Sequence, residues 1–243
     1  MSSKGAPLSF ASALRPRKLA LLFRRARRGS GTKRLVHLGA LGAIAISLWG
    51  PAAIAQCPSP GGVCATPGKD GAGGTLTGVV NAYYPGTTSA AAAATSITVG
   101  PARSVGAQTN IASGDLLLVI QMQGADINSN NNANYGDGTG VGSGYLTTNL
   151  SAGLYEFVKA TSAVTAAAGG TINITGGGTG TGLINAYVNA AATGTTGERS
   201  FQVVRVPQYT TATLSSTLTA GAWDGSGGGI LALDVSTTLT LGG

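Results

Sequence analysis

The residues best suited to chemistry lie in an Asn/Asp-rich stretch at positions 126–137. Its first, third, fifth and twelfth positions are Asp126, Asn128, Asn130 and Asp137, and their side-chain oxygens are ligands of the kind that calcium prefers. The sixth position is asparagine where the turn of a calcium loop needs glycine, and the twelfth is aspartate where a bidentate glutamate is usual. Two interpretations stay open: a site for calcium, the one cofactor the sequence suggests, or an exposed hairpin loop.

Carboxylates could also act in pairs on a glycosidic bond, a reaction that needs no histidine. The candidates are Asp126, Asp137, Glu156, Asp224 and Asp234. Two of them converging in a groove lined by Tyr155, Tyr187 or Trp223 would favour a carbohydrate-active module. The sequence gives no separation between these acids, so no catalytic residue is assigned.

Two cysteines, Cys57 and Cys64, are separated by Pro-Ser-Pro-Gly-Gly-Val. In an oxidising compartment an even number of cysteines favours a disulfide. Closing such a short loop stabilises a fold by about 2–3 kcal/mol, and the bond would fasten the start of the mature chain. Two thiols without two further ligands do not complete a zinc site.

The charges divide the chain unequally. Ten of the 15 Lys and Arg lie between Lys4 and Arg34, whereas all eight Asp and Glu follow position 68. The first 55 residues therefore carry +10 and the remainder −3, which removes the main electrostatic support for nucleic-acid binding by the remainder. The only histidine, His37, also lies in the basic segment. Histidine-dependent triads and histidine metal sites are thus excluded from the rest of the chain.

The basic segment has the features of an export signal. An uncharged stretch at 35–49 follows the arginines, Pro51 ends it, and Ala53-Ile54-Ala55 is a small-x-small cleavage pattern. Cleavage there would leave Gln56 as the mature N-terminus. The protein would then contact the membrane only through the signal segment, during export. The alternative is an uncleaved anchor, because 35–55 is just long enough to span a bilayer if Pro51 is tolerated.

Short runs with the length and composition of β-strands recur after position 74. They are 75–84, 96–99, 115–123, 154–160, 171–175, 182–188, 201–206, 229–235 and 238–241. Apolar and polar residues alternate in 171–175 and 201–206, which is typical of a sheet with one face more exposed to water. The continuous apolar run 116–120 predicts a central strand covered on both faces. Helix is expected only in two alanine-rich stretches, 90–94 and 163–168.

The sequence therefore predicts an all-β protein, built around a glycine-rich β-sandwich-like module. We expect a signal peptide at 1–55, a disulfide-stapled Pro/Gly-rich linker at 56–74 and the module at 75–226. The final part, 227–243, reads as the start of a further glycine-rich segment, such as a β-helix or another β-domain. Because the last run stops without a polar cap, we expect a fragment of a longer protein whose last strand is an edge able to recruit another strand.

Four motifs in order resemble the N-terminal region of large secreted bacterial surface proteins, which are adhesin-like and often carry DUF11-type repeats further along. They lie at 113–126, 153–158, 201–209 and 222–225, and the resemblance covers most of 75–243. It implies a β-rich extracellular module that precedes glycine-rich strands and repeats. It implies no catalytic residue.

These observations predict an exported structural or adhesive β-module, secreted or held at the cell surface, with no catalysis of its own. The alternatives are a carbohydrate-binding or glycoside-hydrolysing extracellular module and, third, a calcium-stabilised adhesin domain. The expected partners are other surface proteins or extracellular polysaccharide, and nucleic acid is not among them.

Overall fold

The computed structural model describes residues 63, 65–128, 133, 144–145, 150–193 and 196–242. The chain divides into two units, residues 1–50 and 51–243, and every described residue belongs to the second. The predicted export signal and both cysteines, Cys57 and Cys64, lie outside the described residues. Within the described ranges, no helix is long and apolar enough to cross a membrane.

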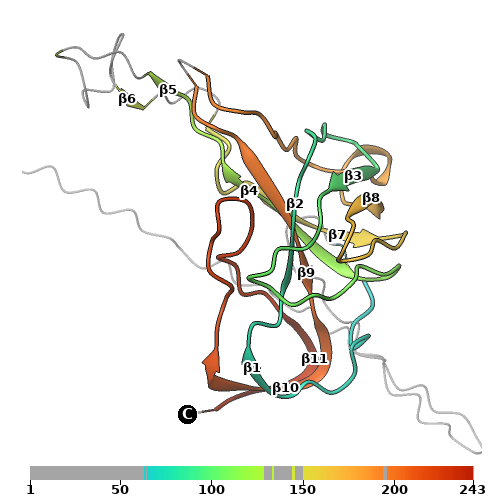
Figure 1. Cartoon of the computed structure of the whole chain (residues 1–243). Helices are drawn as coiled ribbons and strands as arrows, with labels where there is room; N and C mark the ends of the chain where they lie inside the picture. The colour runs from blue at the N-terminus through green and yellow to red at the C-terminus, as the bar shows by residue number, and fades with distance from the viewer. Residues whose placement is uncertain are drawn as a thin grey trace, which may run out of the picture. The chain divides into compact units, whose positions relative to one another are not determined.

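Six strands form one antiparallel sheet in the order β2-β9-β4-β7-β8-β3. They are β2 (Ala82–Pro85), β3 (Ser96–Val99), β4 (Leu116–Gln123), β7 (Tyr155–Ala160), β8 (Gly170–Thr175) and β9 (Ser200–Val206). The two ends of this sheet meet, because Gly86, just after β2, pairs with Val99 of β3. The amide of Gly100 also donates to the carbonyl oxygen of Pro85 at 2.9 Å. We call this closed, barrel-like wall the curled sheet (Figure 1).

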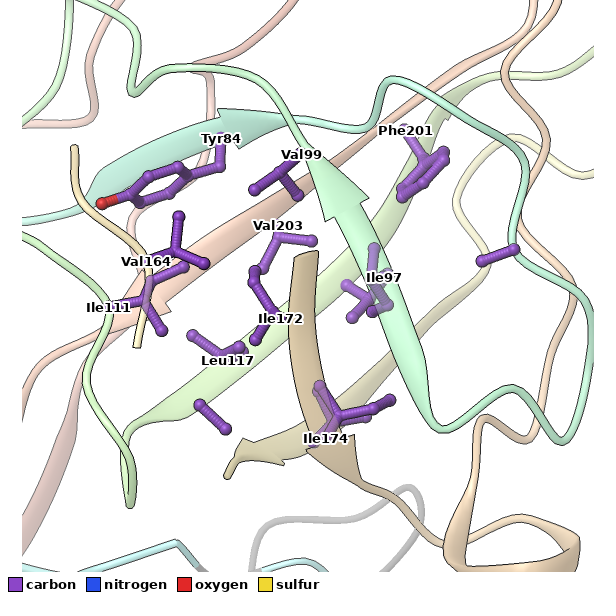
Figure 2. Packing of buried hydrophobic residues seen from close by; sticks show 14 of the residues in the cluster. Tyr84, Ile97, Val99, Ile111, Leu117, Val164, Ile172, Ile174, Phe201 and Val203 are labelled. Atoms are coloured by element: carbon purple, nitrogen blue, oxygen red, sulfur yellow. The ribbon is translucent and has the colours of Figure 1, made fainter. Parts of the chain in front are cut away.

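Alternate side chains of the curled sheet fill its interior. Figure 2 shows Tyr84, Ile97, Val99, Ile111, Leu117, Val164, Ile172, Ile174, Phe201 and Val203, all of them buried in a single apolar cluster. The seam between β2 and β3 needs a glycine, since a Cβ atom at Gly86 would lie 2.2 Å from Cζ of Phe201. The period of two that places these side chains inward is the property of a β-strand that the apolar runs encode.

A second sheet has three parallel strands in the order β1-β10-β11. They are β1 (Gly74–Gly78), β10 (Gln208–Leu218) and β11 (Asp234–Leu241). Only Pro207 separates β9 from β10, so one long run of chain links this parallel sheet to the curled sheet (Figure 1). A short antiparallel pair, β5 (Ile127–Asn128) and β6 (Gly144–Tyr145), and one 3-10 turn, Thr179–Thr181, complete the described elements.

The prediction of an all-β fold is confirmed, and its sandwich-like core takes the form of one sheet curled on itself. β4 lies between β9 and β7, and its residues 116–119 are all buried, as the continuous apolar run predicted. β8 alternates between buried and exposed residues, also as predicted. The alanine-rich stretches 90–94 and 163–168 contain no helix.

The prediction that one face of 201–206 is more exposed to water is wrong, because every residue of β9 is buried. One face of β9 points into the core. The other, which carries Gln202, Val204 and Val206, lies in contact with other segments: Gln202 bonds to Gly228, and Val204 and Val206 belong to a second apolar cluster. A polar residue in an alternating strand therefore marks a hydrogen bond here and not exposure to water.

Three predicted runs differ from the strands that form. The run 75–84 splits into β1 and β2, which belong to different sheets, because Gly78 turns the chain at a φ of 59°. The runs 182–188 and 229–235 are mostly irregular, since side chains elsewhere satisfy much of their backbone. β10 was not predicted as a strand: after Pro207 it is rich in Thr and Ser, without an apolar alternation to signal it.

Candidate functional site

Within the described part of the chain, the largest group of interacting charges lies where the curled sheet meets the parallel sheet. Asp115, just before β4, accepts hydrogen bonds from Arg205 Nε at 2.9 Å and from Lys69 Nζ at 2.5 Å. Arg205 Nη2 also donates to Asp70 at 2.6 Å. The Asp115 side chain is 1% exposed and that of Arg205 is 10% exposed. We call these residues, Lys69, Asp70, Asp115 and Arg205, the Arg205 junction.

Opposite charges stabilise each other within the Arg205 junction. Burial acts to raise the pKa of Asp115, but hydrogen bonds from Lys69, the Ala112 amide and Arg205 outweigh it and lower that pKa below its usual value. Burial likewise acts to lower the pKa of Arg205, and the bonds to Asp70 and Asp115 raise it overall. Asp115 and Arg205 are therefore both held in their charged forms.

The Arg205 junction also fixes the first residues of the parallel sheet. The second carboxylate oxygen of Asp70 accepts the amide of Gln208 at 2.7 Å. The Gln208 side chain then donates to Asp234 at 2.9 Å and accepts the amide of Thr66 at 3.1 Å. Each donor has an acceptor on a different segment, so this is a structural joint between segments that lie far apart in the sequence.

Residues 221–232 are held by buried side chains that bond to their backbone; we call them the docked segment. Asn81 Nδ2 donates to the Ala232 carbonyl at 2.6 Å and its Oδ1 accepts the Ala232 amide at 3.0 Å. Tyr83 Oη donates to the Ile230 carbonyl at 2.6 Å, and Gln202 exchanges two bonds with Gly228. This pairing replaces strand pairing, which explains why the segment is irregular.

Removing the Asn81 side chain should release the docked segment. Asn81 is fully buried and also donates to the Arg205 carbonyl at 3.0 Å. We expect Asn81→Ala to lower the free energy of unfolding by about 2–3 kcal/mol, because it leaves buried backbone groups without partners. Hydrogen exchange of 221–232 should rise at the same time. In Gln108→Ala, which removes only exposed bonds, both quantities should stay at wild-type values; equal effects in the two variants would contradict this role for Asn81.

A fully buried carboxylate, Glu156, lies outside the Arg205 junction. Glu156 of β7 is fully buried, and its two oxygens accept the amides of Ile184 at 2.8 Å and Asn185 at 2.9 Å. Nearby, Tyr187 is fully buried and its hydroxyl makes no hydrogen bond within the described part of the chain. Burial, together with the Glu156 charge, raises the pKa of Tyr187. The carboxylate thus holds an irregular segment, 184–185, against the barrel wall.

The predicted calcium residues are only partly described. Asp126 lies 2.5 Å from Arg199 Nη2 in an ion pair, and its side chain is 7% exposed. Asn128 belongs to β5, and Asn130 and Asp137 lie outside the described residues. In the described ranges no group of three or more His, Cys, Asp or Glu side chains could hold a metal ion. The calcium site therefore stays a prediction.

The aromatic residues proposed for sugar binding differ in their exposure to solvent. Tyr155 and Trp223 are 44% and 38% exposed, whereas Tyr187 is buried inside the curled sheet. The acids beside the two exposed rings are engaged: Glu156 binds backbone amides, and Asp224 pairs with Arg103 at 2.7 Å. Sequence reasoning had no means of locating these partners, because most are backbone atoms.

An open pocket of about 510 Å³ lies between the two sheets. The lining residues are Leu116, Phe157 and Val206 on one side and Leu214, Leu231, Ala232, Leu233, Asp234 and Leu239 on the other. Asp234 is the only charged member, and it is bonded to Gln208. Since every lining residue except Asp234 has an apolar side chain, the pocket offers a surface for packing rather than convergent groups for a reaction.

No protein-family model matches the chain, and no curated protein or solved structure matches it either.

Proposed function

We propose that this chain is an exported structural or adhesive β-module of a bacterial surface or extracellular protein. The observation that carries the proposal is the use made of the buried carboxylates. Asp115 and Glu156, at 2% and 0% exposure, each bind groups that hold distant segments together. Acid–base chemistry requires a carboxylate that faces a substrate, and these two face the fold itself.

The pattern of charge supports export of the module. The basic residues preceding the apolar stretch 35–49 suit a signal sequence, and the module that follows has only 13 charged residues, a net charge of −3 and no histidine. A β-fold with a sequence rich in Thr, Ser and Gly suits a scaffold outside the cell. The resemblance to secreted surface proteins points in the same direction.

Surface labelling tests this proposal. Intact bacteria that produce the full chain are treated with a membrane-impermeant reagent that reacts with amines. Its target is Lys69, whose side chain is 25% exposed. We expect labelling of intact cells, and none in a matched Ile44→Arg variant, whose charge interrupts the apolar stretch and blocks export. After lysis the chain should be labelled in both strains. A wild-type chain labelled only after lysis would overturn the proposal.

A further inference from the structure

The chain that leads into β1 is bound to the parallel sheet before β1 begins. Residues 66–73, which we call the strap, run beside the start of β10, and two strap amides donate to the carbonyl oxygens of Gln208 and Thr211 at 2.8 Å. Lys69 and Asp70 of the strap belong to the Arg205 junction. The strap thus extends the pairing of β1 with β10, and ion pairs fasten it.

The chain enters and leaves the parallel sheet at opposite ends of the strands. It enters through the strap, beside Gln208 of β10, and leaves after Leu241 of β11, which lies opposite Leu214 of β10. These two levels are six residues apart on β10, from 208 to 214, or about 20 Å along the strand. Because β1 and β11 both run parallel to β10, tension between the two points acts along the strands (Figure 1).

Tension in this direction loads the hydrogen bonds of the parallel sheet in shear. Pulling β1 backward and β11 forward stretches all the bonds between neighbouring strands together, whereas separating two strands from one end breaks these bonds one at a time. Part of the sheet is also shielded from water that would compete for its backbone groups, because Leu76 and Ala212 are 5% and 4% exposed. The sheet is therefore strongest in the direction in which the chain itself would pull on it.

This hydrogen-bonded path avoids most of the chain. Residues 79–207, which contain the curled sheet, connect β1 to β10, and residues 219–233, which contain the docked segment, connect β10 to β11. Tension that crosses the hydrogen bonds from β1 to β10 and from β10 to β11 passes through neither connection. The curled sheet shares the load only through the Arg205 junction.

We infer that the parallel sheet is a mechanical clamp, which bears tension between the chain that precedes the strap and the chain that follows β11. The inference rests on the proposed function, because a surface module is under tension when one side is held at the cell and the other is bound elsewhere. The clamp gives the module a specific task, the transmission of force without unfolding of the curled sheet.

Single-molecule pulling on the purified full chain tests this inference. In a Cys57→Ala, Cys64→Ala background, handles are attached at Thr66→Cys and Leu241→Cys, two exposed positions between which tension acts along the strands. The matched control carries its handles at Thr66→Cys and Ser236→Cys. Ser236 is also exposed but lies near the start of β11, at the end of the sheet where the strap enters, so tension acts across the strands and separates them bond by bond.

At one pulling speed we expect the unfolding force along the strands to be at least about twofold higher than the force across them, since the barrier to unfolding governs forced unfolding. Without force the two proteins should melt at the same temperature, because only exposed positions differ. Equal forces, or a lower force along the strands, would overturn the inference. The measurement uses purified protein, so such a result would leave the proposed export untouched.

Discussion

Asp115→Asn should lower the free energy of unfolding by about 3 kcal/mol. The substitution removes a buried negative charge that Arg205 and Lys69 both contact, and breaking a buried ion pair from one side typically costs 3–5 kcal/mol because the partner charge stays buried. Asp70 still contacts Arg205, which places the effect at the lower end of that range. For a domain of this size the melting temperature should fall by about 6–12 °C.

An exposed ion pair provides the control for this prediction. Arg103 and Asp224 are 2.7 Å apart, but their side chains are 39% and 19% exposed, and such pairs contribute under about 1 kcal/mol. We expect Arg103→Gln to remain close to wild type in urea unfolding. If Asp115→Asn also unfolds within 1 kcal/mol of wild type, the Arg205 junction does not hold the sheets together.

Acid should remove the contribution of Asp115. The pKa of this carboxyl is lower in the folded chain than its usual 3.8, so its stabilisation is fully present above that value and is lost as the pH falls through the folded pKa. The wild-type free energy of unfolding should therefore decrease below about pH 4 more steeply than that of Asp115→Asn. Urea unfolding at a series of pH values would measure the difference, and parallel curves would contradict it.

Glu156→Gln should be destabilising by about 2–3 kcal/mol even though it preserves the shape of the side chain. Both carboxylate oxygens accept backbone amides, those of Ile184 and Asn185. A glutamine offers one acceptor oxygen and turns an NH2 group toward the other amide, which leaves a buried donor unsatisfied. Chemical denaturation would measure the loss.

The sign of the Glu156→Gln effect separates a structural carboxylate from a reactive one. Active-site carboxylates are commonly kept at a cost in stability, so that neutralising them leaves stability unchanged or increases it. Glu198→Gln is the matched control, since Glu198 is exposed, and it should have no measurable effect. A Glu156→Gln variant as stable as wild type, or more stable, would favour a carbohydrate-active site over a scaffold.

Strand location was predictable wherever a strand faces the core of the curled sheet. β3, β4, β7 and β8 lie within a residue or two of the predicted runs, because alternating or continuous apolar residues record which faces are buried. In the parallel sheet, β1 and part of β11 fall within predicted runs, whereas β10 does not. Its strands β1 and β10 are more than 100 residues apart in sequence, and their pairing depends on the whole fold bringing them together.

The buried polar side chains that link segments through hydrogen bonds were harder to predict than the strands. Arg205 gave one usable signal, since an arginine between Val204 and Val206 in a strand needs a buried acid as a partner. Asn81, Gln202 and Glu156 gave none, because their partners are backbone groups. Every residue carries such groups, so the sequence does not distinguish the ones that are bound.

The N-terminal residue of the protein recovered from outside the cell is the most direct test of the central claim, that this is a scaffold built for export. Edman degradation or terminal peptide mass spectrometry should identify Gln56, the residue after the Ala53-Ile54-Ala55 pattern. A chain found only inside the cell and still beginning at Met1 would contradict the claim.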